Sequence, residues 1–379
     1  LAAFRSMGVS IEHDGAGNVL VHGRGLHSLS APADTLYLGN SGTAMRLMTG
    51  VLAGQQFSSV VSGDESLNGR PMGRIVKPLS AMGARIDTAA DHRPPLKIHG
   101  GSVTGIDYSM PIASAQVKSC LLLAGLYAEG ETRVHEPGIT RDHTERMLRG
   151  FGYRVDSGEG WAALSGGGEL TGTRIDVPAD ISSAAFFLVG ASIAEGADIT
   201  LKHVGLNPTR TGVIDILRLM GASIDLLNLR EAGGEPVGDI RVRSSVLKGI
   251  TVPRELVPLA IDEFPVLFVA AACAQGETVV EGAEELRVKE SDRIQAMVDG
   301  LRILGTDIEG TSDGAVIRGG AIQGGQVDSL GDHRIAMAFA IAGLRCEKQI
   351  VVTDCDNVDT SFPGFAGLAD SVGLRIEVN

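Results

Sequence analysis

The stretch GVIDILRLMGASID, residues 212–225, decides how this chain is expected to fold. Before its second glycine, the apolar residues Val213, Ile214 and Leu217 recur at helical spacing, which predicts one apolar helix face. After Gly221, apolar and polar residues alternate, which is typical of a strand. Glycine readily adopts the left-handed conformation that ends many helices. The stretch therefore predicts a helix, a tight turn at the glycine and then a strand.

Similar phrases recur along the chain, so we expect a fold built from repeats. Their glycines are spaced about 70–85 residues apart, which is the signature of duplicated structural units, and they are Gly8, Gly83, Gly152, Gly221, Gly305 and Gly373. A second helix and a short strand precede the last five phrases. These helices are apolar nearly all round and should be buried: residues 41–54, 114–130, 182–196, 262–276 and 332–344. Only seven residues precede Gly8, so we expect this chain to lack most of its first repeat.

Composition excludes several classes of protein. The 379 residues suffice for two domains, because a typical domain has about 100–200 residues. The net charge of −13 argues against nucleic acid and anionic membranes as partners. No apolar run approaches the roughly 18 residues of a membrane span, so we expect none. The four cysteines show no C-x-x-C spacing, which favours free thiols in the cytoplasm. Cys120 lies in an apolar helix, so we expect it to be packed rather than nucleophilic.

Each buried helix begins with polar residues, for which two interpretations stand. These residues are Asn40 to Thr43, Ser114 to Gln116, Asp180 to Ser183, Asp262 with Glu263, and Asp332 to Arg334. They could cap the free backbone N–H groups of the helix starts, an interpretation that suffices for Asp180 to Ser183. Alternatively, if the repeats are arranged symmetrically, several helix N-termini converge and form an anion site. Asp262 and Glu263 could equally serve as general acid or base groups.

Basic residues in the loops favour the anion site over scattered surface charges. They are Arg70, Arg74, Arg141, Arg287, Lys289, Arg293 and Arg334. The planar fork of arginine suits phosphate and carboxylate groups. Lys289 and Arg293 are four residues apart, so a helix would place them on one side, with Glu290 and Ser291 as its capping groups. No metal-ligand spacing, P-loop or dinucleotide-binding turn is present, so we expect no metal and no cofactor.

Several motifs, taken in this order, resemble the 5-enolpyruvylshikimate-3-phosphate (EPSP) synthase family over the whole chain. They are LGNSGTAMRL, GDESLNGRPMGR, ASAQVKSCLLLAGL, TRDHTERML, NPTRTG, IDEFPVL, ELRVKESDRI, DHRIAMAFAIAGL and TSFPGF. The forms SAQVK, RDHTE and NPTR resemble the class II branch, which is often associated with tolerance of glyphosate. The resemblance implies an enzyme of the shikimate pathway, which leads to aromatic amino acids. It would transfer the enolpyruvyl group of phosphoenolpyruvate to the 5-hydroxyl of shikimate 3-phosphate and release phosphate.

The resemblance also implies a fold and a set of site residues. The fold is the two-domain α/β enolpyruvyl transferase fold, with βαβαββ repeats around a pseudo-threefold axis in each domain. We expect the domains at residues 1–177 and 178–379, with the active site in the cleft between them and a monomeric protein. The implied ligands of shikimate 3-phosphate are Ser114, Ala115, Gln116, Arg141, Asp262 and Lys289. Those of phosphoenolpyruvate are Gly42, Arg70, Gln116, Arg293 and Arg334. The implied catalytic residues are Asp262, which takes the hydroxyl proton, and Lys289, Glu290 and His333, which surround the enol carbon and the leaving phosphate.

The sequence departs from the family pattern at three places. The Lys-Ser…His-Arg segment near the family's start has no counterpart here, so we expect this chain alone to be inactive or nearly so unless a further N-terminal segment completes it. Thr360 stands where some members have lysine. Gly42 leaves space that alanine would fill, which predicts appreciable binding of the inhibitor glyphosate despite the class II motifs.

Two alternative functions remain at this point. One is a catalytically impaired fragment that binds the substrates without chemistry. The other is the sister enzyme UDP-N-acetylglucosamine enolpyruvyl transferase, which shares the fold. That family uses a loop cysteine, and the loop GDESLNGRPMGR has none.

Overall fold

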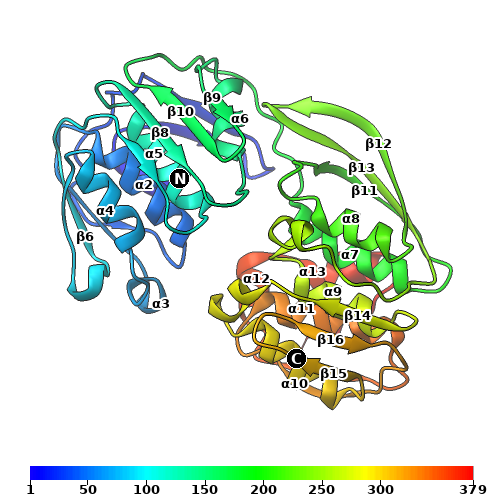
Figure 1. Ribbon diagram of the computed structural model, residues 1–379. Helices are drawn as coiled ribbons and strands as arrows, with labels where there is room; N and C mark the ends of the chain where they lie inside the picture. The colour runs from blue at the N-terminus through cyan, green and yellow to red at the C-terminus, as the bar shows by residue number, and fades with distance from the viewer. Residues whose placement is uncertain (379) are drawn as a thin grey trace. The chain divides into compact units, whose positions relative to one another are not determined.

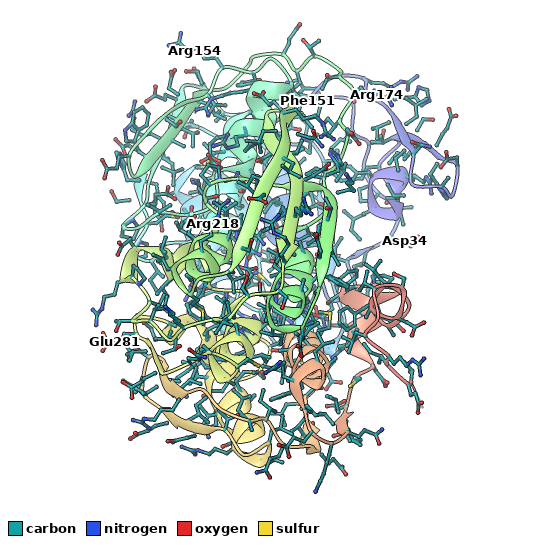
Figure 2. All side chains as sticks on the ribbon, turned by 90° about the vertical axis from the view of Figure 1, so that its right-hand side faces the viewer. Asp34, Phe151, Arg154, Arg174, Arg218 and Glu281 are labelled. Carbon is teal, nitrogen blue, oxygen red and sulfur yellow. The ribbon has the colours of Figure 1, made fainter. Side chains whose placement is uncertain are left out.

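The computed structural model describes residues 1–378 and divides the chain into two compact units (Figure 1). The first unit is Leu1–Ile175, and the second begins at Asp176. Exposed charged side chains such as Arg154 and Glu281 lie on the surfaces of the units (Figure 2). Among the described residues, no helix combines the length and the apolar character that crossing a membrane requires.

The first unit contains six helices and ten strands among the residues described, together with one 3₁₀ turn (η). In chain order they are α1 (Ala2–Ser6), β1 (Ser10–His13), β2 (Val19–His22), β3 (Leu36–Tyr37), α2 (Gly42–Ala53), β4 (Ser59–Ser62), α3 (Glu65–Asn68), α4 (Gly73–Ala81), β5 (Arg85–Asp87), η1 (Ala90–His92), β6 (Leu96–His99), β7 (Asp107–Ser109), α5 (Ala115–Gly125), β8 (Glu131–His135), α6 (His143–Gly150), β9 (Asp156–Gly158) and β10 (Trp161–Ser165).

The second unit follows with longer strands and more 3₁₀ turns. Its elements are α7 (Ile181–Ile193), β11 (Asp198–Gly205), α8 (Gly212–Leu219), β12 (Ser223–Ala232), β13 (Glu235–Arg243), η2 (Arg254–Leu256), η3 (Pro258–Ala260), α9 (Phe264–Ala272), β14 (Glu277–Val280), η4 (Glu284–Val288), α10 (Arg293–Ile303), β15 (Asp307–Gly310), β16 (Ala315–Arg318), β17 (Gly325–Asp328), α11 (His333–Ala342), η5 (Gly343–Arg345), β18 (Ile350–Thr353), α12 (Asn357–Ser361) and α13 (Phe365–Ser371).

The sheets confirm the repeated βαβαββ unit. In the first unit, the strand orders β3-β4-β6-β5 and β7-β8-β10-β9 are the same pattern, with the first pair parallel and the others antiparallel. In the second unit, β11-β13-β12 and β14-β16-β15 keep the last three strands of that pattern. The first strand of each is reduced to isolated parallel bridges, Ala179 with Val204 and Thr251 with Val279.

The glycine that marks each repeat adopts the conformation expected from the sequence. All six glycines have φ between 78° and 99°. In each case the glycine N–H donates to the carbonyl three residues earlier, for example from Gly221 to Arg218. A side chain would be strained at such a φ. The recurring phrase therefore marks six helix ends of the same geometry.

One predicted strand is absent. After Gly373, residues 374–378 form no strand, although their sequence alternates as a strand should. Within the described chain, Leu374 donates its N–H back to Ala369, and residues 374–378 join no ladder. A strand is stabilised by its hydrogen-bonded neighbour, so alternation alone does not produce one.

Buried helices form the cores. In the second unit α7, α9 and α11 pack against one another, and in the first unit α2 packs against α5. Gly50 permits this close approach, because a Cβ there would lie 2.2 Å from the carbonyl oxygen of Cys120. Cys120 is fully buried, and burial raises the pKa of its thiol to about 12. The burial confirms that Cys120 is packed, and a raised pKa disfavours the reactive thiolate.

Candidate active site

Capping explains four of the five polar helix starts. The side chains of Ser41, Ser114, Asp180 and Asp332 accept hydrogen bonds from backbone N–H groups in the first turns of α2, α5, α7 and α11. Glu263 precedes α9 but makes no capping bond. The carboxylate of Glu263 is therefore available for other contacts.

In the first unit, two arginines lie against the start of α2. A Cβ on Gly42 would come within 2.9 Å of Arg46 Nη1 and 3.5 Å of Arg70 Nη1. Arg70 donates to Asn40 Oδ1 over 2.9 Å. The side-chain partners of Arg46 and Arg70 among the described residues are neutral, namely Gln116 for Arg46 and Asn40 and Ser66 for Arg70. Two neighbouring guanidinium groups without an acidic partner suit a small anion.

Gln116 connects this pair of arginines to α5. Its Oε1 accepts a hydrogen bond of 2.6 Å from Arg46 Nη1, and its Nε2 donates to Thr43 Oγ1 over 2.8 Å. Burial lowers the pKa of Arg46, and the nearby charges of Arg70 and Arg74 lower it further. The lowered pKa indicates a cationic cluster in which an anionic ligand would relieve repulsion.

The other first-unit candidates lie at the start of α5 and just before α6. Ser114 and Ala115 are the N-cap and first residue of α5, next to Gln116. Arg141 is half-buried and follows Thr140, whose hydroxyl donates to Glu136. Because Glu136 pairs with Lys118 of α5, the segment that carries Arg141 lies beside the start of that helix.

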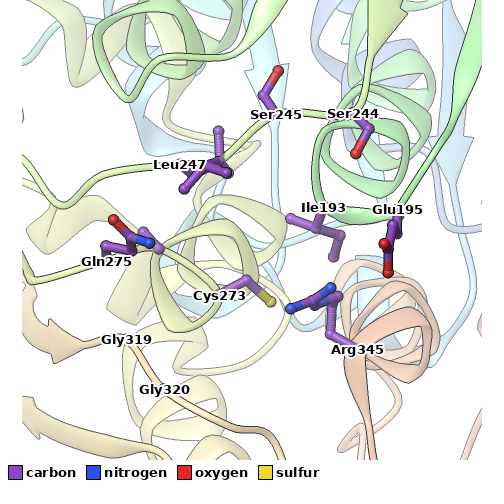
Figure 3. Close-up of a pocket in the computed structure, with 12 residues that line it drawn as sticks. Ile193, Glu195, Ser244, Ser245, Leu247, Cys273, Gln275, Gly319, Gly320 and Arg345 are labelled. Atoms are coloured by element: carbon purple, nitrogen blue, oxygen red, sulfur yellow. The ribbon is translucent and has the colours of Figure 1, made fainter.

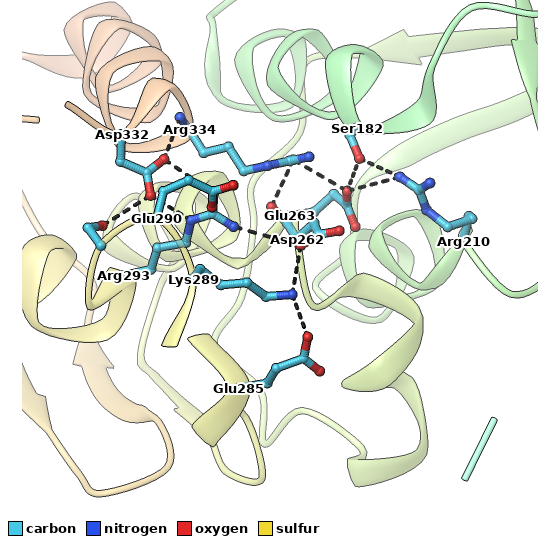
Figure 4. Close-up of polar contacts among 11 residues, drawn as sticks. Ser182, Arg210, Asp262, Glu263, Glu285, Lys289, Glu290, Arg293, Asp332 and Arg334 are labelled. Carbon is cyan, nitrogen blue, oxygen red and sulfur yellow. Dashed lines mark hydrogen bonds and ion pairs between the residues drawn. The ribbon is translucent and has the colours of Figure 1, made fainter. Parts of the chain in front are cut away.

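In the second unit, one predicted catalytic residue and two predicted ligands of phosphoenolpyruvate meet at Asp262 (Figure 4). Lys289 Nζ lies 3.3 Å from Asp262 Oδ1, and Arg293 Nη1 lies 3.7 Å from the same atom. Arg334 Nη1 donates to the Asp262 carbonyl over 3.0 Å. Two cations from different elements thus approach the Asp262 carboxylate, while Arg334 holds the main-chain carbonyl of the same residue.

A buried ion pair fixes Arg293 in place. Its Nε lies 2.8 Å from Asp332 Oδ2, and both side chains are at most 2 % exposed. Burial opposes ionisation of Asp332, but the charge and hydrogen bonds of Arg293 outweigh it and lower the pKa of the carboxyl group. Arg293 also donates to Glu290 over 2.6 Å. The predicted residue Glu290 therefore lies in the same cluster.

Glu263 forms a second network behind Asp262. Its Oε1 accepts a short hydrogen bond from Ser182 and lies 3.7 Å from Arg334 Nη1 and 3.8 Å from Arg210 Nη2. Burial raises the pKa of Glu263, against the opposing charges of Arg334 and Arg210. This network holds the Arg334 guanidinium near Glu263, while Asp332 accepts a hydrogen bond from the Arg334 backbone N–H.

His333 lies at the start of α11, between Asp332 and Arg334. Burial lowers its pKa, and the positive charge of Arg334 lowers it further. A histidine with a lowered pKa is neutral at pH 7, so its imidazole can both donate and accept one hydrogen bond.

The prediction that Lys289 and Arg293 share a helix is wrong. Lys289 follows η4 with ψ of −148°, and α10 begins only at Arg293 with Asp292 as its N-cap. Ser291 donates to Asp332 and caps no helix. The two cations nevertheless meet, because both reach Asp262 from different elements.

Sequence reasoning missed three participants: Arg46, Ser182 and Arg210. Arg46 is the only charged residue in α2, and a single charge in a helix that is otherwise apolar was a usable signal. Ser182 was explained as part of a cap. It also hydrogen-bonds Glu263, which lies 81 positions away, and local sequence carries no sign of that contact.

A separate cavity of about 540 Å³ lies in the second unit (Figure 3). Cys273, Arg345 and Glu195 are among its lining residues, and none of the predicted site residues is. In the described part of the chain, no group of three or more His, Cys, Asp or Glu side chains is placed to hold a metal ion.

Comparison with known proteins decides the family. The family model for EPSP synthase (3-phosphoshikimate 1-carboxyvinyltransferase) matches residues 1–368. The chain belongs to the EPSP synthase family. It is 63% identical to a 3-phosphoshikimate 1-carboxyvinyltransferase of Methylococcus capsulatus, over all of this chain and 87% of that protein. A similar relative from Acidithiobacillus ferrooxidans is 62% identical, again over 100% of this chain and 87% of the other.

A solved structure supports the assignment of the fold. The EPSP synthase of Acinetobacter baumannii superimposes with a TM-score of 0.94 and 57% sequence identity, over 100% of this chain and 87% of that one. The sister family that acts on UDP-N-acetylglucosamine is thereby set aside, and the chain is a transferase with the enolpyruvyl transferase fold.

Proposed function

We propose that this chain carries out the reaction of its family with the two groups of residues described above. The reaction transfers the enolpyruvyl group of phosphoenolpyruvate to the 5-hydroxyl of shikimate 3-phosphate and releases phosphate. The observation that carries the proposal is the meeting of Asp262 with Lys289 and Arg293 in a chain that matches the family model over residues 1–368.

The arginines bind the anions in this proposal. Arg70 and Arg46 in the first unit, and Arg293 and Arg334 in the second, hold the carboxylate and phosphate of phosphoenolpyruvate. Gln116 orients Arg46 through its hydrogen bond of 2.6 Å. Ser114, Ala115 and Arg141 bind shikimate 3-phosphate at the start of α5. Fixed cations stabilise charge that moves during reaction without having to reorganise.

Asp262 starts the chemistry. Its carboxylate takes the proton of the 5-hydroxyl while the oxygen attacks C2 of phosphoenolpyruvate, and C3 gains a proton. The resulting tetrahedral intermediate then loses phosphate from C2 and a proton from C3. Glu290 and Lys289 exchange protons with C3 and with the leaving phosphate, and His333 lies beside them. Positioned acid and base groups on either side of the reacting carbon are what both steps require.

Asp262→Asn tests the proposal. It removes the base but keeps the shape, so phosphate release should fall about 10²–10⁴-fold, a far larger loss than that in calorimetric affinity for shikimate 3-phosphate, to which the asparagine can still hydrogen-bond. Asp299→Asn, at an exposed position of α10, is the matched control and should retain activity. Near-normal turnover by the Asp262 variant would overturn the assignment. Phosphate release by the unaltered protein also distinguishes an enzyme from a fragment that only binds.

Three finer expectations belong to the same proposal. Glyphosate binds in the space beside Gly42, near Arg46 and Arg70. The protein is a monomer, which light scattering would test. It works in the cytoplasm, where its four free cysteines would stay reduced.

A further inference from the structure

A buried lysine lies one turn inside α5 and has no assigned role. Lys118 is 2 % exposed. Its Nζ lies 2.8 Å from Glu145 Oε1 and 3.1 Å from Glu136 Oε2. The side chains of these glutamates are only 3% and 9% exposed. One cation and two carboxylates thus share a site that is closed to water.

The two glutamates lie on either side of Arg141 in the sequence. Glu136 follows β8, and Thr140 donates to it from Oγ1 over 2.5 Å, directly before Arg141. Glu145 lies in the first turn of α6, four positions after Arg141. Lys118 therefore ties both ends of the segment that carries Arg141 to α5.

Lys118 balances the buried charge of the Glu145 carboxylate. Its Oε2 is buried and has no hydrogen-bond partner, and in the described part of the chain its Oε1 contacts only Lys118. A second, weaker link between α5 and α6 is the 2.7 Å hydrogen bond from Thr144 Oγ1 to Ser119 Oγ. Removing one member of a buried ion pair leaves an uncompensated charge. Loss of the lysine would thus release the start of α6.

We propose that Lys118 is a positioning residue for shikimate 3-phosphate. Through Glu136 and Glu145 it holds the segment that carries Arg141 at a fixed place beside the start of α5, so that the site is formed before the substrate arrives. A binding group held by its supporting contacts loses less freedom on binding. The lysine itself contacts no substrate. The inference rests on the proposed function, which assigns Ser114, Ala115 and Arg141 to this ligand.

Lys118→Met is the first test, because it removes the charge and keeps the length. The KM and calorimetric Kd for shikimate 3-phosphate should rise about tenfold or more, the scale of one charge-assisted contact. The KM for phosphoenolpyruvate and kcat should change less than about threefold, a split that general destabilisation would not produce. Unchanged affinity, or equal losses in both KM values and kcat, would overturn the proposal.

Arg149→Met is the matched control. Arg149 lies near the far end of α6, where its Nε donates to the Val155 carbonyl over 3.0 Å. The control loosens the same helix without touching the Lys118 cluster, so both KM values should stay near normal. A rise in the KM for shikimate 3-phosphate as large as that of Lys118→Met would show that any loosening of α6 suffices, and would overturn the specific role.

Glu136→Gln tests the same positioning role if Lys118→Met does not fold. It leaves a neutral pair of Lys118 with Glu145 and weakens only the hold on the residues before Arg141. The Kd for shikimate 3-phosphate should rise about threefold to tenfold, and Lys118→Arg, which keeps the charge, should lie nearer to the unaltered protein. A normal Kd for Glu136→Gln would refute the positioning role.

Arg141→Lys distinguishes a failure of the substrate assignment of Arg141 from a failure of the positioning role of Lys118. If this variant binds shikimate 3-phosphate normally, the assignment of Arg141 to that substrate fails, and the role of Lys118 fails with it. If Arg141→Lys is impaired and the Lys118 and Glu136 variants are normal, only the positioning role fails. The double variant Glu136→Gln with Arg141→Lys should lose less binding free energy for shikimate 3-phosphate than the sum of the two single losses, because both changes act on one contact.

Discussion

Arg46 of α2 donates a hydrogen bond of 2.6 Å to Gln116 of α5, although the two residues are 70 positions apart. The same arginine lies beside Arg70, across the space that Gly42 leaves open. An amide is the suitable partner here because it orients the guanidinium without neutralising it. A carboxylate in its place would compete with the anionic substrate.

Gln116→Glu should therefore weaken binding of phosphoenolpyruvate. The new carboxylate would pair with Arg46, and the KM for phosphoenolpyruvate should rise at least about tenfold, since a hydrogen bond to a charged group is worth about 1.5–3 kcal/mol. Steady-state kinetics at saturating shikimate 3-phosphate measures the change. Gln56→Glu, at the exposed end of the α2–β4 connection, is the control, and an equal effect there would point to general charge instead.

Gly42→Ala should reduce inhibition by glyphosate more than it reduces use of phosphoenolpyruvate. The added Cβ would lie 2.9 Å from Arg46 Nη1, so the guanidinium must move from its present place. The inhibition constant should rise at least about tenfold, because one extra methyl group in a tight site is worth about 1–3 kcal/mol. Competitive inhibition assays measure both constants, and an unchanged inhibition constant would contradict the steric account.

Gly50→Ala should destabilise the first unit, because the new Cβ would lie 2.2 Å from the backbone carbonyl oxygen of Cys120. Backbone cannot move aside as a side chain can, so we expect a loss of about 3 kcal/mol, the upper part of the range for overpacked cores. Chemical denaturation followed by circular dichroism measures it. Gly101→Ala has no neighbour within 4 Å and should be nearly neutral, so equal losses in the two variants would refute the close-packing explanation.

The sequence predicted those features that each repeat enforces locally. A left-handed turn needs glycine, so Gly83 and Gly221 reveal the repeat even without structure. Contacts across the fold were less accessible. Lys289 and Arg293 were placed on one helix, yet they meet at Asp262 through tertiary packing. Lys118 and Arg46 left a weaker signal, a single charge in an apolar helix, whose partners only the fold can supply.

Asp332→Asn should lower stability at neutral pH and much less in acid. Arg293 lowers the pKa of Asp332 against the effect of burial. The contribution of this carboxylate is therefore complete above the unfolded value near 3.8 and is lost as the pH falls through the lower folded value. At pH 7 the variant leaves Arg293 buried with only Glu290 and Asp262 nearby, so the free energy of unfolding should fall by about 3 kcal/mol.

The difference between Asp332→Asn and the unaltered protein should shrink as the pH falls below the unfolded value near 3.8, because the unfolded carboxyl group takes up a proton there and the native one follows only at its lower pKa. Urea unfolding at pH 7 and across the acid range measures this difference. Asp307→Asn removes an exposed carboxylate, 69% accessible and paired with Arg318, and should cost at most about 1 kcal/mol at any pH. If the free energy of unfolding of Asp332→Asn stays lower by the same amount down to the pH at which the protein is half unfolded, the charge explanation is wrong. The shape of Asp332, and not its charge, would then be what Arg293 requires.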